Sequence, residues 1–556
     1  MKSSIGDIGY HKSNSTSKLD PKDRVKIMTR VSVVLLSVFI SSVIVSPFQL
    51  LPTSLQLPVA FAQQVSFNSP VPLDNSQGDQ VDSHIASSGN TAYMTWTSEV
   101  NGISKILFAK SSNGGNSFDS RKTLSDDSGS HFAFLSDIAV SGNNVYVVWT
   151  DVTTTVDIVF IKSTDGGNSF TQPIKLNDGN EPNGRFPRIA VSGSNVFVAW
   201  QDLACCPSGV DSDIFFAVST NGGTTFSNPL NVSNNPGTLS NSPSIAASST
   251  NVYIAWSDCE PNGTNCKLLY TKSTNAGTSF ANPVTLSGPP SSLPDIKAFN
   301  DKVYIVYGQL HSVNNVDIRD VFLQKSADGG TTFGSPINLS ENIPNAARSQ
   351  NPNLDVSGDN VAVTYEVRND FDTNPHWEVV FRGSTDAGNA FSQPKSVSST
   401  LGNLDSSLND VTISGNNVYV TWNTFENPNF NTYFAAGTIT PSVSPVEGIE
   451  NLIATIDNMN LIKSVKTSLE GPLHNAIKLL TDNDPTNDKD VCAKLDSFKA
   501  QVDAKEKNGQ LASQQAAVLR AQATAIQSSI PCSSASQLGS NSLTEDNSRG
   551  IIALPY

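Results

Sequence analysis

A repeated octapeptide constrains the fold of this chain more than any other feature of the sequence. Six copies of Ser-x-Asp/Asn-Gly/Ala-Gly-x-Ser/Thr/Ala-Phe occur between Ser111–Phe118 and Ser384–Phe391. Ser and Asp/Asn side chains accept backbone N–H bonds in tight turns, and glycine supplies positive φ, so each copy predicts a turn between antiparallel strands. We expect the structural residues of these turns to be Ser111, Asn113, Asp165, Asn221, Asn275, Asp328 and Asp386.

A second repeated unit precedes each octapeptide. It has two alternating strands around a Gly-Asn turn, as in Ile138–Trp149, and this pattern predicts a hairpin. Each hairpin closes with an aromatic residue, which we expect to pack between units rather than to form a sugar platform: Trp96, Trp149, Trp200, Trp256, Tyr307, Tyr365 and Trp422. The mean spacing is about 54 residues, and four strands within such a period are typical of a β-propeller.

The repeat contains seven hairpins but only six octapeptides. The seventh unit ends with Thr432–Ile439 and has neither a turn motif nor a last strand. The pattern of the last strand, Phe-x-x-Pro, stands instead at the other end, in Phe67–Leu73, with no hairpin ahead of it. The sequence therefore predicts an all-β propeller of seven four-stranded blades, closed by the N-terminal strand. Six blades with an accessory hairpin are the alternative.

The octapeptide resembles the Asp-box, or BNR repeat, of sialidase-like β-propellers, and the similarity covers residues 66–439. The resemblance implies the fold and no particular activity, because in that superfamily the box is a turn remote from the active face. Sialidases of the family have six blades and bind a carboxylate with three arginines, the first in an early Phe-Arg-Ile-Pro motif. This chain has no arginine between Arg30 and Arg121, and its nearest string, Phe186–Ile189, has a different order.

The loops between the second and third strands should lie at the mouth of the central channel, together with the loops between blades. The candidate ligand-face residues there are Arg185, Arg188, Asp151, Asp202, Asp213, Asp258 and Arg368, with Arg319, Arg348 and Glu366 nearby. For most of the acidic residues we favour a structural role, accepting backbone N–H bonds in turns. Ca²⁺ binding is an alternative, although no loop has DxDxDG spacing.

The histidines give no catalytic assignment. His131, His311 and His376 stand alone in loops, without a partner at metal or triad spacing. The sequence therefore predicts no zinc site and no Ser/His/Asp nucleophile, and catalytic residues remain unassigned.

The N-terminal segment has the pattern of a secretory signal. Basic residues precede Val31–Val45, which carries no charge, and a small-x-small site follows at Ala60–Ala62. An uncleaved anchor is the alternative, but this apolar run is shorter than the ~20 residues that span a bilayer. We expect cleavage before Gln63, no membrane span in the mature chain, and a secreted or cell-surface protein.

The six cysteines suit an oxidising compartment. Cys259 and Cys266 flank a turn-rich loop and should pair, as should Cys492 and Cys532. Cys205 and Cys206 are adjacent, so a bridge between them would be strained, and two free thiols are the alternative. We expect the vicinal bridge.

After residue 446 the apolar period changes from two to about 3.6, which predicts short amphipathic helices up to Cys532. The last of these has its apolar stripe at Val518, Leu519, Ala523 and Ile526. The segment loosely resembles FIMAH-type helical modules of secreted microbial proteins. The expected organisation is a signal peptide (1–62), a propeller (63–440), a linker (441–447), a helical module with a disulfide (448–532) and a disordered tail (533–556).

Charge and architecture together limit the function. The formal net charge is −15, which argues against nucleic acid as a partner. We expect a binding or interaction protein for an extracellular glycan or protein, rather than an enzyme. One alternative is a sialidase-like exo-glycoside hydrolase. Another is a structural surface-layer or assembly component, which would suit the glycosylation sequons at Asn231, Asn262 and Asn338 in the expected mature chain.

Overall fold

The computed structural model describes residues 64–73, 78–125, 131–177, 183–203, 211–313, 316–341, 348–368, 375–440, 445–482, 490–528 and 530. The expected leader (1–62), the Cys205–Cys206 pair, Cys532 and the expected tail (533–556) lie outside the described residues. The β region and the helical region are treated separately below.

The β region is built from repeated antiparallel units of four strands. The first three units are β3 (Asp79–Ser88), β4 (Thr91–Val100), β5 (Ile103–Ser111) and β6 (Lys122–Thr123); β7 (Phe132–Ser141), β8 (Asn144–Val152), β9 (Val156–Ser163) and β10 (Ile174–Lys175); and β11 (Gly184–Ser192), β12 (Asn195–Asp202), β13 (Asp213–Ser219) and β14 (Leu230–Asn231).

The next three units are β15 (Leu239–Ser248), β16 (Asn251–Cys259), β17 (Lys267–Ser273) and β18 (Val284–Ser287); β19 (Ser291–Phe299), β20 (Lys302–Val313), β21 (Val316–Ser326) and β22 (Ile337–Asn338); and β23 (Arg348–Ser357), β24 (Asn360–Arg368), β25 (Trp377–Ser384) and β26 (Lys395–Ser396). A short 3₁₀ turn, Ser399–Leu401, follows. One parallel bridge, between Arg319 and Arg348, joins the last two of these units.

The last unit combines both ends of the repeat region. It contains β27 (Ser406–Ser414), β28 (Asn417–Glu426) and β29 (Asn429–Thr440), with β1 (Gln64–Phe67) and β2 (Val71–Pro72) paired to β29. The register places Phe67 opposite Gly437 and Val71 opposite Phe434. The N-terminal segment thus supplies the outer strand that β29 would otherwise lack.

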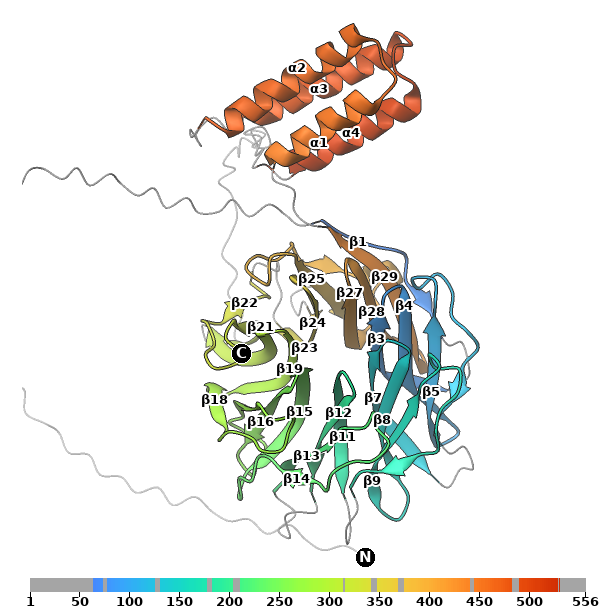
Figure 1. Ribbon diagram of the computed structural model, residues 1–556, viewed down its shortest axis with the longest axis vertical. Coiled ribbons are helices and arrows are strands. Elements are labelled where there is room, and N and C mark those ends of the chain that lie inside the picture. The colour runs from blue at the N-terminus through green and yellow to red at the C-terminus, as the bar shows by residue number, and fades with distance from the viewer. Residues whose placement is uncertain are drawn as a thin grey trace, which may run out of the picture. The chain divides into compact units, whose positions relative to one another are not determined.

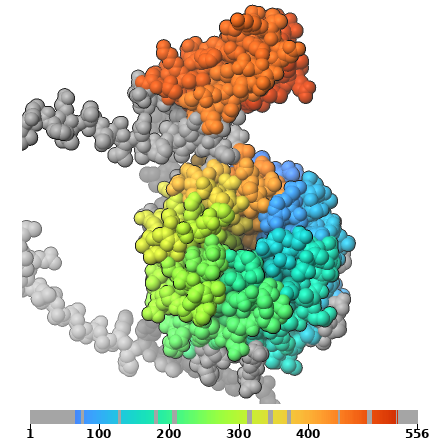
Figure 2. Space-filling model, viewed as in Figure 1, coloured from blue at the N-terminus to red at the C-terminus, as the bar shows by residue number. Residues whose placement is uncertain are grey.

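The first strands of the units lie around a common centre (Figure 1). Each contacts the first strand of the next unit along the chain, and β27 contacts β3. In the space-filling view, the orange end of the β region adjoins its blue beginning (Figure 2). The result is a propeller-like arrangement of sheets.

The closing aromatic residues form the core between neighbouring units. All seven are at most 1% exposed, which agrees with the expected packing role. The second strand of each unit is buried on both faces, because a neighbouring unit covers each face. Its sequence is therefore a continuous apolar run, such as Val145–Trp149.

The octapeptide forms the same hydrogen-bonded turn in each copy. In the second copy, Ser163 Oγ donates to Asp165 Oδ1 (2.7 Å) and accepts from Gly167 N (2.8 Å). Asp165 Oδ1 also accepts from Ser169 N at 2.9 Å. The equivalent bonds recur around Ser111, Ser219, Ser273, Ser326 and Ser384. The box thus closes its own turn, and its second glycine faces the neighbouring unit.

The second glycine of the box joins one unit to the next. Gly223 has φ +74°, and a Cβ there would lie 2.5 Å from Cζ of Phe160 in the preceding unit. Only glycine allows this close approach. The same contact pairs Gly167 with Phe108, Gly277 with Phe216, Gly330 with Tyr270, and Gly115 with Phe434. The last pair connects the first unit to the last.

Phe67 takes the place of a box phenylalanine in the last unit. Its ring meets Phe381 of the preceding unit edge-on, with centroids 5.1 Å apart. Box residue Phe226 meets Phe160 in the same way at 4.9 Å. The N-terminal strand therefore repeats the packing of a complete unit.

The helical region contains α1 (Pro445–Asn458), α2 (Lys463–Leu480), α3 (Asp490–Lys507) and α4 (Ser513–Ser528). Helix α1 begins inside the expected linker. The expected apolar stripes meet in one core that includes Leu469, Leu495 and Leu519, but Val518 is 42% exposed, so its place in the stripe was wrong. Cys492 is in a disulfide. No helix in the described part of the chain is long and apolar enough to cross a membrane.

The packing of the box glycine can be tested with two glycines of the same unit. Gly193 also has positive φ (+60°), but nothing lies within 4 Å of the position that a Cβ would take there. G193A should cost about 1 kcal/mol of unfolding free energy for the backbone alone. G223A should cost about 1–3 kcal/mol more, because the methyl group would overlap Phe160. Equal losses in denaturant titrations of the two variants would contradict the proposed contact.

Candidate functional site

The first strand of every unit contains a β-bulge. In β11, for example, the register with β12 shifts between Arg185 and Arg188. The bulge places one non-glycine residue per unit in the left-handed region, with φ between +49° and +55°: Asp82, Leu135, Phe186, Ser242, Leu293, Asn351 and Leu408. This conformation costs roughly 1–2 kcal/mol per residue, and such strain concentrates at functional sites.

The seven bulges surround a cavity of about 250 Å³, here called the channel mouth. A second cavity of about 430 Å³ lies along the same strands and shares His84, Arg188, Asp295 and Asn353 with the mouth. All seven first strands contribute to both cavities, so the two lie on the axis around which the units are arranged. Because a bulge redirects side chains, the bulge residues point where an ordinary strand residue could not.

The rim of the channel mouth is partly apolar. Phe186, Leu293 and Leu408 are 42%, 39% and 43% exposed, and Leu135 is half-buried beside them. Exposed apolar side chains around a concavity are unusual on a soluble surface unless they meet a ligand or partner.

Below the rim, side chains at one repeated position hold neighbouring units together. Asp137 Oδ2 accepts from Ile189 N of the next unit (2.8 Å), and Asp295 Oδ2 accepts from Leu354 N (2.9 Å). Asp410 Oδ2 accepts from Ile85 N (3.0 Å), which connects the last unit to the first. Ser244 makes the equivalent bond to Ile296 N, and Asp355, two residues beyond this position in β23, bonds Ile413 N of the next unit. These bonds are here called the axial clamps.

At this position two units carry a base, and the sixth unit carries Asn353, whose Nδ2 donates to Asn409 O of the last unit (2.7 Å). His84 stands at this position in the first unit and Arg188 in the third. His84 Nδ1 lies 3.2 Å from Asp410 Oδ2, and its Nε2 lies 3.7 Å from Asp82 Oδ1. Arg188 Nη1 is 3.2 Å from both ring nitrogens of His84. An atom equally distant from the two nitrogens is not in line with the in-plane lone pair of either one. This geometry allows both ring nitrogens to carry protons.

The carboxylates decide the charge state of these bases. Burial and the neighbouring Arg188 lower the pKa of His84, but hydrogen bonds to Asp410 and Asp82 outweigh them and raise it to about 10. Burial likewise lowers the pKa of Arg188, while Asp137, Asp295 and other nearby carboxylates raise it overall. The pKa of Lys297 is also raised, because Asp295 and Asp355 outweigh its burial. The channel thus holds three cations among five aspartates.

Two acceptor atoms at the mouth have no hydrogen-bond partner among the described residues. They are Asp82 Oδ2 and Asn409 Oδ1, and both are buried from solvent. A buried polar atom without a partner costs free energy, so such atoms are available to a ligand that brings O–H or N–H groups.

The expected arginines lie in strands rather than in loops, because the strands extend further than the sequence pattern indicates. Arg188 lines the channel from β11, whereas Arg185 is exposed, with Nε 3.4 Å from Asn183 Oδ1. Arg319, Arg348 and Arg368 lie opposite one another on β21, β23 and β24. The guanidinium of Arg368 lies 5.9 Å from the centroid of the Trp377 ring.

The expected acidic residues make contacts within their own units. Asp151 lies 3.1 Å from His131 Nδ1, and Asp202 accepts from Trp200 Nε1 at 3.3 Å. Asp213 accepts from Ser233 and Asn231, and Asp258 accepts from Thr238 and Ser240. Glu366 is the exception, because it accepts from Leu408 N of the next unit (2.7 Å) as well as from Asn351 of its own unit (2.8 Å), and both partners belong to the mouth. Their roles in binding remain predictions.

The residues that the sequence analysis missed are those of the channel itself: Asp82, His84, Asp137, Asp295 and Asp410. A signal was present, because four of them occupy one position of the repeat, two residues after the bulge residue and directly before an apolar residue, as His84 does before Ile85, whereas Asp82 is itself the bulge residue. Among the described residues, no group of three or more His, Cys, Asp or Glu side chains is arranged to hold a metal ion.

No protein-family model and no curated protein matches the sequence. Similar solved structures include phage phi92 endosialidase (10% identity, 68% of this chain and 70% of that chain, TM-score 0.39). Another is Trypanosoma rangeli sialidase (11% identity, 71% of this chain, TM-score 0.38), of which this chain spans 62%. A third is polysaccharide lyase Uly1 (11% identity, 66% and 91%, TM-score 0.41). The chain resembles sialidase-like proteins, and at this similarity nothing follows about its activity.

The charge state of His84 predicts a pH-dependent stability. Because its folded pKa of about 10 exceeds the usual value of 6.5, its stabilisation is complete below pH 6.5 and is lost as the pH rises towards 10. Between pH 6.5 and 9, the wild type should lose about 2–3 kcal/mol of unfolding free energy more than H84Q. Denaturant titrations at the two pH values measure this difference. Parallel losses in both proteins would contradict a protonated His84.

Proposed function

We propose that the chain is a seven-bladed propeller, closed by its N-terminal strand, that acts as an extracellular binding protein and holds a glycan at the channel mouth. The observation that carries the proposal is the combination found there: an apolar rim above buried acceptors without partners and a charged arginine. Binding sites for small polar ligands commonly combine apolar walls with a few convergent polar groups.

The chemistry of the mouth suits a sugar ring. A pyranose has an apolar C–H face, which can pack on Phe186 and its neighbours in the rim, and hydroxyl groups that both donate and accept. Asp82 Oδ2 and Asn409 Oδ1 can accept hydroxyl protons, and Arg188 can donate.

The blade number and the closure are supported by contacts that run from the last unit to the first. The Asp410–Ile85 clamp and the Gly115–Phe434 contact both join these units, and β1 pairs with β29. An extracellular location is supported by the disulfide between Cys259 and Cys266, since such bonds persist in oxidising compartments.

A sialidase-like glycoside hydrolase is the second candidate, because Asp82 and Asp410 lie beside the strongly shifted His84, and shifted pKa values cluster at catalytic sites. Binding is favoured over hydrolysis because Asp137 and Asp410 are engaged in axial clamps. Arg188, in turn, lies among carboxylates of the channel and is less available to the carboxylate of a sialic acid.

A glycan array probed with the full chain should identify a ligand, which then allows a matched pair of variants. F186A removes a rim side chain and should weaken binding about tenfold, the effect of losing a contact of roughly 1–2 kcal/mol. F132A removes a similarly exposed phenylalanine (47%) of β7 that does not line the mouth, and it should bind like the wild type. Equal effects of the two substitutions on titrated affinity would place the site elsewhere.

The same ligand separates binding from hydrolysis. Incubation with the wild type should leave the glycan intact, and D82N should weaken binding because an acceptor oxygen is lost. Release of a monosaccharide that D82N abolishes would instead establish the hydrolase.

A further inference from the structure

Two of the three sequons in the described β region are explained by the blade repeat. Asn231 and Asn338 end the last strand of their units, in Asn231-Val-Ser233 and Asn338-Leu-Ser340. The serines bond a carboxylate of the third strand: Ser233 Oγ donates to Asp213 Oδ1 and Ser340 Oγ to Asp320 Oδ1, both at 2.7 Å.

The asparagines of these two sequons are held by the same carboxylates. Asn231 Nδ2 donates to Asp213 Oδ2 (2.7 Å), and Asn338 Nδ2 donates to Asp320 Oδ2 (3.0 Å). To enter the active site of a glycosylating enzyme, either Nδ2 would first have to leave a charged hydrogen bond inside the unit. The fold thus accounts for these sequons without glycosylation.

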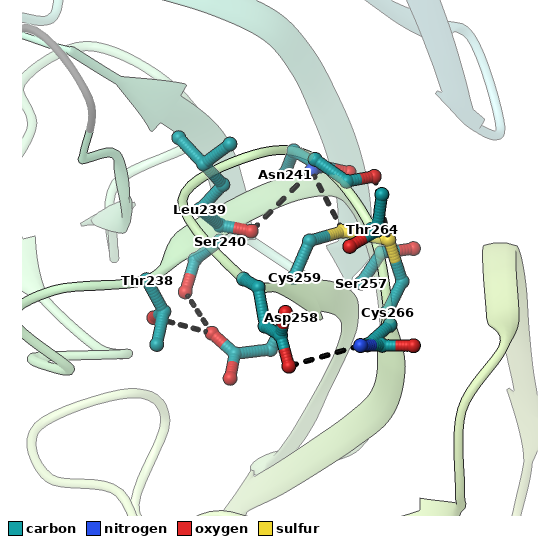
Figure 3. Close-up of a disulfide and its surroundings, with 12 residues drawn as sticks. Thr238, Leu239, Ser240, Asn241, Ser257, Asp258, Cys259, Thr264 and Cys266 are labelled. Carbon is teal, nitrogen blue, oxygen red and sulfur yellow. Dashed lines mark hydrogen bonds between the residues drawn. A yellow bond between two sulfur atoms is a disulfide. The ribbon is translucent and has the colours of Figure 1, made fainter. Parts of the chain in front are cut away.

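The third sequon, Asn262-Gly263-Thr264, lies outside the blade repeat. It belongs to the loop between β16 and β17, which the Cys259–Cys266 disulfide closes. Figure 3 shows Thr264 beside this disulfide. Residues 260–265 are exposed, and Glu260 N donates to Thr264 O across the loop (2.9 Å). The loop is therefore both ordered and open to solvent.

The side chain of Asn262 is held with its amide nitrogen free to react. Thr264 Oγ1 and Thr264 N both donate to Asn262 Oδ1, at 2.6 Å and 3.0 Å. These bonds fix the carbonyl end of the side chain towards the loop. No hydrogen bond to Nδ2 is found among the described residues, in contrast to Asn231 and Asn338.

We propose that Asn262 is an N-glycosylation site and that Asn231 and Asn338 are not modified in the folded protein. The sugar donor is a lipid-linked oligosaccharide phosphate. Asn262 Nδ2 forms a bond to the anomeric carbon and loses a proton, while the bond from that carbon to the lipid phosphate breaks and the phosphate leaves. The acceptor motif and the disulfide belong to the same extracytoplasmic chemistry. This proposal is independent of what the channel mouth binds.

The test compares folded and unfolded forms of the same chain. Protein from a host without N-glycosylation, with its disulfides intact, is incubated with an oligosaccharyltransferase and the lipid-linked donor. A second sample is first reduced and denatured. Peptide mass spectrometry then measures the occupancy of the three sequons. In the folded chain, Asn262 should be modified at least about tenfold more than Asn231 or Asn338, because those two must first break a charged hydrogen bond.

In the denatured chain this preference should disappear, since all three sequons are then accessible. T264A should abolish modification at Asn262 in both samples, and T264S should retain it. Equal occupancy of the three sites in the folded chain would overturn the proposal. So would the absence of modification at Asn262, in the folded or in the denatured sample.

Discussion

The axial clamps are the interaction on which the rest of this structure depends. In each clamp, a side-chain oxygen of one unit accepts a backbone N–H from the next unit. The donor lies in the first strand of that unit, in the part that follows the β-bulge. Because the bond crosses between units, it limits the rotation of the two units that it joins. At the outer part of the interfaces, the second glycine of the box packs against an aromatic ring of the neighbouring unit. The two units can approach this closely because glycine has no side chain.

The clamps also explain why the channel has its particular charge. Carboxylates suit the task, since an ionised oxygen makes a stronger bond to a backbone N–H than a neutral one. A ring of aspartates on one axis would repel itself, however, and His84, Arg188 and Lys297 offset that repulsion. The same groups lie under the bulges, so the residues that align the units also form the floor of the mouth. Structure and proposed binding site are therefore coupled.

Most of the architecture could be predicted from the sequence because it is repeated. The octapeptides and the hairpins with their closing aromatic residues recur at a regular spacing. Phe67–Leu73 matches the pattern of a last strand, and the pairing of β1 with β29 agrees with that match. The Cys259–Cys266 bridge could be predicted because its loop is short. The motifs themselves are local in sequence, so neighbouring residues are enough to reveal them, and the pairing of the two distant ends follows from the repeat.

The candidate site was harder to predict, because a bulge shifts register by one residue and a period-two pattern does not show where. Arg188 was therefore expected in a loop, and His84 and Asp410 were not recognised as neighbours. They are 326 residues apart, and only the meeting of the first and last units brings them together. Asp151 and Asp258 were found by type and spacing, but the sequence could not show that side chains of their own units already bond them.

Removal of the N-terminal strand tests the central claim most directly, namely that this strand completes the last unit and so stabilises the ring and its mouth. A chain that begins at Gln80 lacks β1 and β2 and leaves the edge of β29 unpaired. Its β region should melt about 5 °C or more below that of the full chain, and a peptide spanning Val65–Asp74 should restore part of the loss. An unchanged melting temperature would contradict this account and would favour a smaller ring with Phe67–Leu73 as a free tail.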